Sequence, residues 1–331
     1  MSKKTYYSII AVIVAAVFVM LGVFWVKSEE SKESITAVFV SKSTQKGFEF
    51  WNLVKQGAEE GAKEFGVNLK VTGPNAGDDA PLSESDAQAQ FRQLEEAIEQ
   101  KPDVILLAAV DQDKLLPYAK EAMNRGIKLV MVDSGLSENI EDCFVGTDNY
   151  VAAGSVGRQM SQYIGNEGKV AIISHQMMTS TSIERIAGFE DALGREGVQV
   201  IGKYDIGDSV ELAYTTTLQV LEENPDLKGI FATNQISAEG VNKALLESGK
   251  YDTVAFFAID SSNALNEGME KGAVKGVAVQ MPFNMGYMGI KAAVDLAKGN
   301  SIAKEIDTGF AFVTKENMRQ EEIQKLIYPF V

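Results

Sequence analysis

The chain has 331 residues, of which 45% are hydrophobic and 23% charged, so it holds enough apolar material for two globular domains of ordinary size. Its formal net charge is -15 and it contains a single histidine. This balance argues against a nucleic-acid partner, because phosphate binding requires a basic surface. The only cysteine, Cys143, cannot form an internal disulfide, and we expect it to be a small buried residue.

A long apolar segment lies close to the amino end. Lys3 and Lys4 precede an uncharged stretch over residues 9–26. As a helix rising ~1.5 Å per residue, this stretch would span most of a ~30 Å hydrocarbon core. We expect residues 1–34 to form an uncleaved membrane anchor and a charged tether, with the two lysines on the cytoplasmic side. The alternative is a secretory signal cleaved after Ser28, and both interpretations place the rest of the chain outside the cytoplasm.

Strand-like and helix-like patterns alternate from residue 35 nearly to the end of the chain. Apolar residues at helical spacing predict a helix from Phe50 to Phe65, which Gly66 ends, and a strand over 67–71. The next predicted elements are a polar loop over 73–85, a helix through Phe91 and Ile98 ending before Pro102, a strand over 104–109, a helix capped by Asp113 and ending at Gly126, a helix from Asp148 to about 164, a strand over 169–174, a helix over 182–194, a strand over 198–204 and a helix over 210–222. This alternation predicts parallel sheets with right-handed crossovers.

Five apolar, strand-like runs each end on a single polar residue. These residues are Ser41, Asp133, Asn234, Asp260 and Gln280. In open α/β sheets, ligands bind beyond the carboxyl ends of the strands, so the five residues predict one shared site. They include no pair of nucleophile and base. The set is typical of a site that holds a polar, uncharged molecule by hydrogen bonds.

Searches for catalytic and metal motifs are negative. Residues 165–169 superficially resemble a phosphate loop, but Val170 stands where that motif needs Ser or Thr. Asp78 and Asp79 are expected in a solvated acidic loop. His175 follows a predicted strand and could line a cleft, but without a second histidine or a cysteine cluster we interpret it as a surface or loop residue. We therefore expect no enzyme activity, no metal and no cofactor.

Several separated segments carry a family resemblance. They are Phe39-Val40-Ser41, Phe50-Trp51, Val54-Lys55-Gln56-Gly57-Ala58, Met131-Val132-Asp133-Ser134, Val145-Gly146-Thr147-Asp148-Asn149, Glu184-Arg185, Gly188-Phe189, Phe231-Ala232-Thr233-Asn234, Ile259-Asp260 and Val279-Gln280. In order and spacing, residues 35 to about 315 resemble the sugar-binding proteins of the ribose-binding type, which serve bacterial ABC importers.

The resemblance implies the type I periplasmic-binding fold. This fold is α/β, with two doubly wound parallel-sheet lobes joined by a three-crossover hinge and a ligand buried between them. The implied lobes are residues 35–147 plus 281–308 for the N-terminal lobe and 148–280 plus 309–331 for the C-terminal lobe. The implied crossovers lie near Asp148, Gln280 and residues 307–309.

The resemblance also implies nine ligand-binding residues. They are Ser41, Phe50, Trp51, Asp133 and Ser134 in the first lobe, Arg185, Asn234 and Asp260 in the second, and Gln280 at a crossover. Sugar hydroxyls donate to carboxylates and accept from guanidinium groups, and a sugar's C–H face stacks on aromatic rings. Structural roles compete with three assignments: Asp133 as a loop cap, Arg185 as a surface cation beside Glu184, and Phe50 as part of its helix's core face.

Two departures bear on the ligand and its delivery. Ser134 stands where ribose-specific members carry Arg, and Asp208 lies about where they carry an aromatic residue, so we expect another neutral sugar, a polyol or a sugar-like signal. The expected partner is an ABC permease, and the alternative is a membrane sensor histidine kinase that reads lobe closure. A related transcriptional repressor would need an amino-terminal helix-turn-helix, where this chain has its apolar segment.

Overall fold

The structure is a computed structural model that describes residues 34–45, 48–74, 84–194 and 197–328. Residues 36–331 form one compact unit. The predicted membrane anchor over residues 9–26 lies outside the described residues, as do Asp78 and Asp79. None of the helices in the described ranges is long and apolar enough to cross a bilayer.

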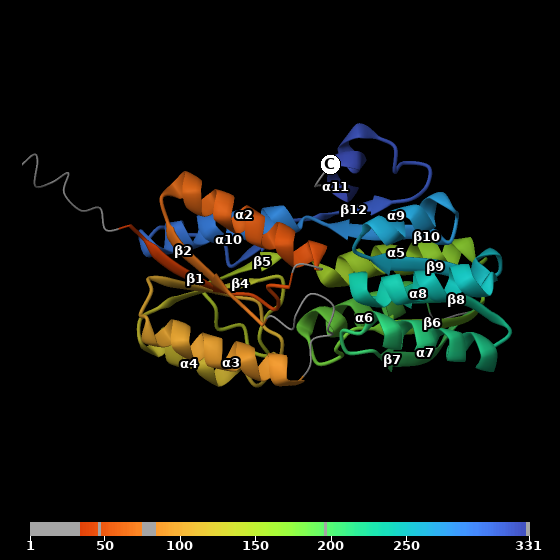
Figure 1. Cartoon of the computed structure of the whole chain (residues 1–331), viewed down its shortest axis with the longest axis horizontal. Coiled ribbons are helices and arrows are strands. Elements are labelled where there is room, and N and C mark those ends of the chain that lie inside the picture. Colours follow the sequence, from red (N-terminus) through yellow and green to blue (C-terminus); the bar gives the residue numbers. More distant parts are fainter. Residues whose placement is uncertain (1–33, 46–47, 75–83, 195–196, 329–331) are drawn as a thin grey trace, which may run out of the picture. The chain divides into compact units, whose positions relative to one another are not determined.

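The first of two sheets lies in the half of the unit that holds its first residues, from Thr36 onward (Figure 1). Its strands are all parallel, in the order β11 (Glu305–Asp307), β5 (Cys143–Gly146), β4 (Lys128–Val132), β3 (Val104–Leu107), β1 (Thr36–Val40) and β2 (Asn68–Thr72). Helices α2 (Glu49–Phe65) and α10 (Pro282–Ala297) pack together on one face, and α3 (Glu84–Glu99) and α4 (Leu116–Asn124) cover the other (Figure 1).

The second sheet repeats the same order of connections. Its strands are β12 (Phe310–Val313), β10 (Val274–Gln280), β9 (Ala255–Ile259), β8 (Leu227–Ala232), β6 (Gly168–Ser174) and β7 (Val198–Asp205). Its helices are α5 (Asn149–Tyr163), α6 (Ser180–Ala192), α7 (Val210–Glu223), α8 (Gln235–Ser248), α9 (Asn263–Glu270), the 3-10 turn η1 (Lys250–Asp252) and α11 (Glu321–Ile327). The edge strand β12 runs antiparallel to β10, a detail that the prediction of parallel sheets did not include.

Side chains that alternate along the strands form the two cores of the second sheet. Ile172 faces α5 and α6, whereas its neighbour Ile173 faces α7, α8 and α9. A strand with both faces covered in this way reads as a continuous apolar run, which is why period-2 alternation is absent from the sequence here. The predicted architecture of two doubly wound sheets is confirmed.

The chain passes between the sheets three times. It leaves the first sheet after β5, returns from β10 into α10, and crosses again between β11 and β12. Two of these crossings are bonded to each other: the Thr308 N–H donates to the Gly146 carbonyl at 2.8 Å, and the Asp148 N–H donates to Asp307 Oδ1 at 3.3 Å. Gly309, at a φ of 75°, adopts the left-handed conformation that the turn into β12 requires. The exact lobe boundaries stay a prediction.

Most predicted helix ends agree with the structure. Gly66 ends α2 in a left-handed conformation, as expected. Asp113, however, does not cap α4: the carboxylate of Asp111 accepts the N–H groups of Asp113 and Lys114, and the helix begins later, at Leu116, with Pro117 in its first turn. Cys143 is buried in β5, as expected, and burial raises the pKa of its thiol to about 11.

Candidate functional site

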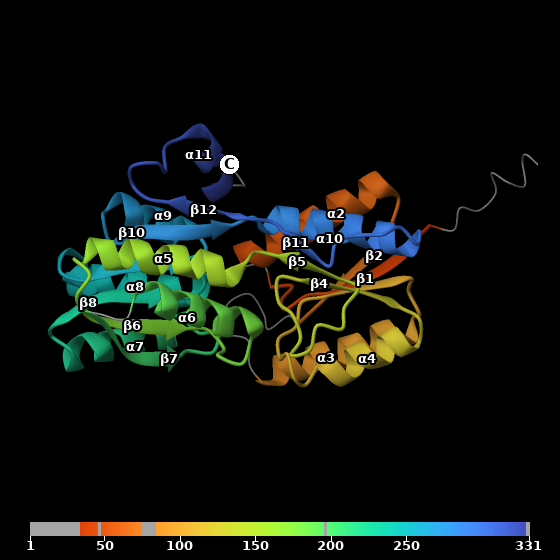
Figure 2. The ribbon, with the colours of Figure 1, turned by 180° about the vertical axis from the view of Figure 1, so that it is seen from behind.

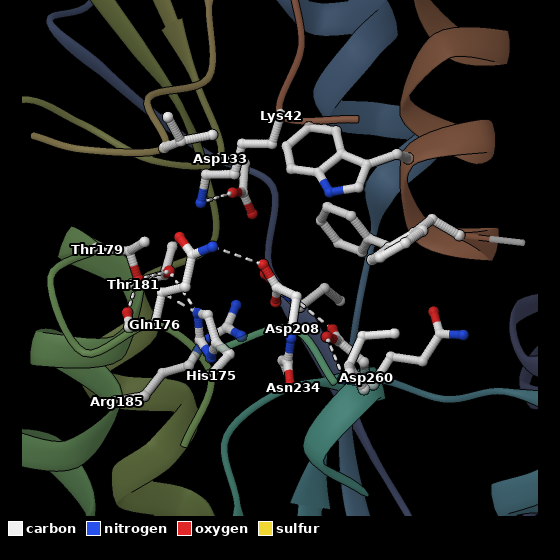
Figure 3. A pocket seen from close by; sticks show the side chains of 17 residues that line it. Lys42, Asp133, His175, Gln176, Thr179, Thr181, Arg185, Asp208, Asn234 and Asp260 are labelled. Atoms are coloured by element: carbon white, nitrogen blue, oxygen red, sulfur yellow. Dashed lines mark hydrogen bonds and ion pairs between the residues drawn. The ribbon is translucent and has the colours of Figure 1, made fainter. Parts of the chain in front are cut away.

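A cavity lies at the carboxyl ends of strands from both sheets (Figure 3). It encloses about 600 Å³, including its opening to solvent. Its walls are Lys42, Phe48, Phe50, Trp51, Val110, Asp133, His175, Gln176, Thr179, Thr181, Arg185, Asp208, Asn234, Gln235, Ile236, Asp260 and Gln280. We call this space the cleft cavity. It lies where the polar residues after the strands predicted a shared site.

Seven of the nine predicted site residues line the cleft cavity. They are Phe50, Trp51, Asp133, Arg185, Asn234, Asp260 and Gln280. Ser41 and Ser134 do not line it, although both follow the expected strands. The hydroxyl of Ser41 donates to the carbonyl of Ser43 at 3.0 Å, and that of Ser134 donates to the carbonyl of Ala109 at 3.2 Å. These buried serines hold the loops behind the cavity wall.

Two aspartates occupy equivalent positions, each directly after the fourth strand, in chain order, of its sheet. Asp133 follows β4 at a φ of 66°, and Asp260 follows β9 at a φ of 72°. Aspartate tolerates this left-handed conformation better than most residues do, but it still carries backbone strain. The shared bend directs both carboxylates into the cavity in place of continuing the strands (Figure 3).

The two carboxylates differ in their partners. Asp133 forms an ion pair with Lys42, whose Nζ lies 3.3 Å from Oδ2. Asp260 accepts a hydrogen bond from Gln280 Nε2 at 2.6 Å and another from the Gln235 N–H at 3.1 Å. Burial raises the pKa of Asp260, although nearby Arg185 and these two donors oppose the shift.

Arg185 extends from α6 into the cavity and is only 3% exposed, so the alternative of a surface cation is wrong. Its Nε donates to Asn149 Oδ1 and its Nη1 to the carbonyl of Thr233, both at 2.8 Å. Asn149 in turn donates to Glu184 at 3.1 Å. Because two bonds fix the guanidinium plane, its remaining donors keep one direction, as recognition of a hydroxyl requires.

Aromatic and amide groups complete the wall. Phe50 and Trp51 meet edge to face, with ring centroids 5.1 Å apart, and both line the cavity. Phe50 is half-buried, so it is not confined to the core face of α2. Asn234 caps α8 through Oδ1, which accepts from the Ser237 N–H at 3.0 Å. This cap fixes the amide at the cavity edge.

His175 lies in the loop after β6, one of the two predicted alternatives, but it is buried and is not a surface residue. The residue is 6% exposed and lines the cleft cavity. Its Nδ1 lies 2.9 Å from Thr233 Oγ1 and its Nε2 lies 3.1 Å from Thr181 Oγ1. Burial, together with Arg185 and Lys42, lowers the pKa of His175 well below its ordinary value. The imidazole is therefore neutral at physiological pH and forms an uncharged, polar part of the cavity wall.

Asp208 brings a third carboxylate to the cavity from the loop after β7. Its Oδ2 accepts from Gln176 Nε2 at 2.9 Å (Figure 3). Burial raises the pKa of Asp208 to about 6, with Asp205 acting in the same direction and Lys42 opposing it. Asp208 is the residue that lies about where, by the family resemblance, ribose-specific proteins carry an aromatic residue.

Sequence reasoning missed most wall residues that lie on loops. Lys42 comes one residue after the β1 run, Gln176 and Thr179 lie in the connection between β6 and α6, and Thr181 lies in the first turn of α6. A usable signal existed for Lys42 and His175, because each directly follows a serine at the end of an equivalent strand. No local pattern distinguishes Gln176 from an ordinary loop amide.

Comparisons with known proteins find similar sequences and similar folds. The chain is 26% identical over 284 residues to the D-ribose/D-allose-binding protein of Pseudomonas aeruginosa, covering 84% of this chain and 87% of the relative. A carbohydrate transporter solute-binding protein from Agrobacterium radiobacter, solved with D-arabinose, matches at a TM-score of 0.82 and 27% identity, over 90% of this chain and all of that one. An ABC transporter solute-binding protein from Agrobacterium vitis, solved with D-fucose, matches at 0.81 and 31%, over 89% and 100%.

The family model for the periplasmic binding protein domain matches residues 38–301. That span contains the strands that end at the cleft cavity and most of both sheets. The relatives are binding proteins of transport systems and not enzymes, in agreement with the lack of a nucleophile and base pair among the predicted site residues. The chain belongs to the periplasmic binding protein family and has its type I fold of two parallel-sheet lobes.

Proposed function

We propose that the chain is an extracytoplasmic receptor that binds a neutral sugar or a sugar-like polyol in the cleft cavity and delivers it to an ABC importer. The observation that carries the proposal is the convergence, from both sheets, of seven residues expected to bind a sugar. The relatives named for D-ribose and D-allose, and the structures solved with D-arabinose and D-fucose, support a monosaccharide as the ligand.

The wall chemistry suits adjacent hydroxyl groups. Asp133 and Asp260 are acceptors, and Arg185 is a fixed donor, so together they satisfy hydroxyls that both donate and accept. Trp51 and Phe50 offer aromatic surface to the C–H face of a sugar ring. Lys42 and Asp208 also line the cavity, although neither is among the nine predicted ligand-binding residues. Lys42 offers the ligand a further donor, and Asp208 offers a further acceptor.

Calorimetry tests the ligand class directly. We expect at least one member of a panel of D-ribose, D-allose, D-arabinose, D-fucose and common polyols to bind, and to stabilise the chain by about 2.7 kcal/mol at ~100 times its dissociation constant. Asp133→Asn and Asp260→Asn should each weaken that binding at least tenfold, or about 1.4 kcal/mol. Asp252→Asn, at an exposed position on η1, is the matched control. Failure of the whole panel to bind would contradict the proposal.

The apolar segment is proposed to hold the receptor at the membrane. Residues 9–26 are long enough for a single-pass anchor, with the binding unit outside the cytoplasm. We expect the full chain to partition with membranes and a piece starting near Glu33 to remain in solution. Recovery of the native product in the soluble fraction, with Glu29 as its first residue, would instead support a cleaved signal.

The membrane partner is proposed to be a permease, and the alternative is a sensor histidine kinase. Both would read closure of the lobes over the ligand, so the binding unit alone does not distinguish them. Cross-linking of the full chain in host membranes, followed by mass spectrometry, identifies the partner. Capture of a permease supports import, and capture of a kinase without a permease contradicts it.

A further inference from the structure

The two lobes touch at places outside the cleft cavity. The loop after β4 belongs to the first lobe and α6 to the second, and Figure 2 labels both elements. The Gly135 N–H in that loop donates to Oγ of Ser180, the first residue of α6, at 3.0 Å. Neither residue lines the cleft cavity. This bond therefore holds the lobes together without contacting a ligand in the cavity.

The amino end of α2 makes a second contact, and it points toward the second lobe in both views (Figure 1, Figure 2). Phe48, directly before the helix, packs against the core of the second sheet. Glu49, the first residue of the helix, accepts a hydrogen bond at Oε1 from Asn263 Nδ2 on α9, at 3.3 Å. The structure therefore describes a closed arrangement, in which the lobes meet at two separate elements.

Closure also brings two like charges near each other. Glu239 lies on α8 of the second lobe, and its charge acts on Glu49 of the first. Burial raises the pKa of Glu49 and Glu239 adds to the shift, whereas the bond from Asn263 opposes it. The ionised carboxylate of Glu49 is therefore less favourable in the closed arrangement than in an open one, where water replaces the second lobe.

We propose that Glu49 and Ser180 set the sugar affinity in opposite directions from outside the cleft cavity. Ser180 stabilises the closed arrangement through its bond to Gly135, and Glu49 destabilises it through its charge near Glu239. This inference rests on the proposed function, since a ligand held by both lobes binds the closed arrangement. The apparent dissociation constant depends on the fraction of protein that is closed, so these residues change the affinity without touching the ligand.

Calorimetry on the full chain in a mild detergent tests the proposal with D-ribose, D-allose, D-arabinose and D-fucose. Glu49→Gln keeps the oxygen that Asn263 bonds and removes the charge, so we expect it to tighten sugar binding by about threefold. Ser180→Ala removes the bond to Gly135 and suits the helix, so we expect it to weaken binding by about threefold or more. Glu60→Gln, at an exposed position farther along α2, is the matched control and should leave the affinity unchanged.

A double-substitution cycle tests whether Glu49 acts through Glu239. Glu239→Gln keeps an oxygen for Gln235 Nε2, which donates to Glu239 at 2.9 Å, and it should also tighten binding by about threefold. Because the repulsion disappears when either charge is removed, the double variant should gain less than the product of the two single gains. A gain equal to that product would overturn the assignment to this pair.

Neutron scattering from the sugar-free full chain, in contrast-matched detergent, separates this proposal from the receptor function. We expect a smaller radius of gyration for Glu49→Gln than for Ser180→Ala, because more of the first variant is closed. Equal radii in the two variants would overturn the proposal, as would equal sugar affinities in Glu49→Gln and the parent. If none of the four sugars binds, the receptor function fails, and the order of the two radii still decides the proposal.

Discussion

Asn149 shows how a residue behind the cavity wall affects binding. It does not line the cleft cavity, but its Oδ1 accepts from Arg185 Nε at 2.8 Å and its Nδ2 donates to Glu184. Asn149→Ala leaves the guanidinium with the Thr233 carbonyl as its remaining described partner. We expect this positioning change to weaken sugar binding by roughly fivefold, equivalent to about 1 kcal/mol. Unchanged affinity by calorimetry would mean that Thr233 alone orients Arg185.

Asp208 should make the empty receptor less stable as pH rises. Burial raises its folded-state pKa from 3.8 to about 6, so between these values the folded protein binds the proton more tightly than the unfolded chain does. Stability associated with this group is therefore present at low pH, is lost as pH rises from about 3.8 to 6, and stays lost above that range. The full shift corresponds to about 3 kcal/mol as an upper value.

Asp208→Asn tests this dependence. The variant keeps an oxygen for Gln176 and removes the charge, so it should stabilise the sugar-free protein by about 1 to 3 kcal/mol at pH 7.5 and by less at pH 5. Urea unfolding at both pH values measures the difference, with Asp252→Asn as the exposed control. An equal gain at both pH values would attribute the effect to something other than titration of Asp208.

The first lobe depends on close contact between helices α2 and α10. A Cβ atom on Gly57 of α2 would lie 2.0 Å from the carbonyl oxygen of Phe283 on α10. Gly57→Ala should therefore destabilise the protein by about 1 to 3 kcal/mol, despite the better helix propensity of alanine. Gln56→Ala, at the exposed neighbouring position, should change the free energy of unfolding by less than about 0.5 kcal/mol in urea titrations. Equal effects of the two substitutions would show that α10 yields to the added methyl group.

Element patterns made the fold predictable, because they act locally. Apolar periodicity defined α2, and a left-handed glycine, Gly66, marks its end. The cap at Asp113 was mispredicted for a local reason. The Asp111 carboxylate accepts the nearby N–H groups in a turn, and the helix begins only at Leu116, with Pro117 in its first turn. The antiparallel edge strand β12 was missed because its direction depends on the third crossover and not on its own residues.

The candidate site was predictable only in part, for a related reason. Strand ends are visible in sequence as apolar runs that stop, and they led to Asp133 and Asp260. Whether a side chain turns toward the cavity depends on backbone direction after the strand: Ser41 and Ser134 satisfy loop carbonyls, whereas Lys42 reaches Asp133. The neutral state of His175 depends on its burial and on Arg185 and Lys42, which come from other elements, and no local pattern reveals it.

The arrangement of the whole binding unit connects ligand binding to motion. Asp133 and Lys42 reach the cleft cavity from the first sheet, and Arg185 and Asp260 reach it from the second. The chain joins the sheets through three short crossings, two of which bond to each other through Thr308 and Gly146. A ligand that contacts both sheets binds the closed arrangement better than an open one, so it shifts the population toward closure by its differential affinity.

Small-angle scattering should detect this closure. For the piece starting near Glu33, we expect the radius of gyration to fall when a sugar confirmed by calorimetry is added to saturation, because hinge closure brings the two sheets together. Asp260→Asn, measured at the sugar concentration that saturates the parent, should stay partly open, since it removes the charged acceptor contributed by the second sheet. If the parent keeps the same radius of gyration at saturation, the ligand either contacts one sheet only or binds a unit that is closed without it, and the importer would then need another signal to recognise the loaded receptor.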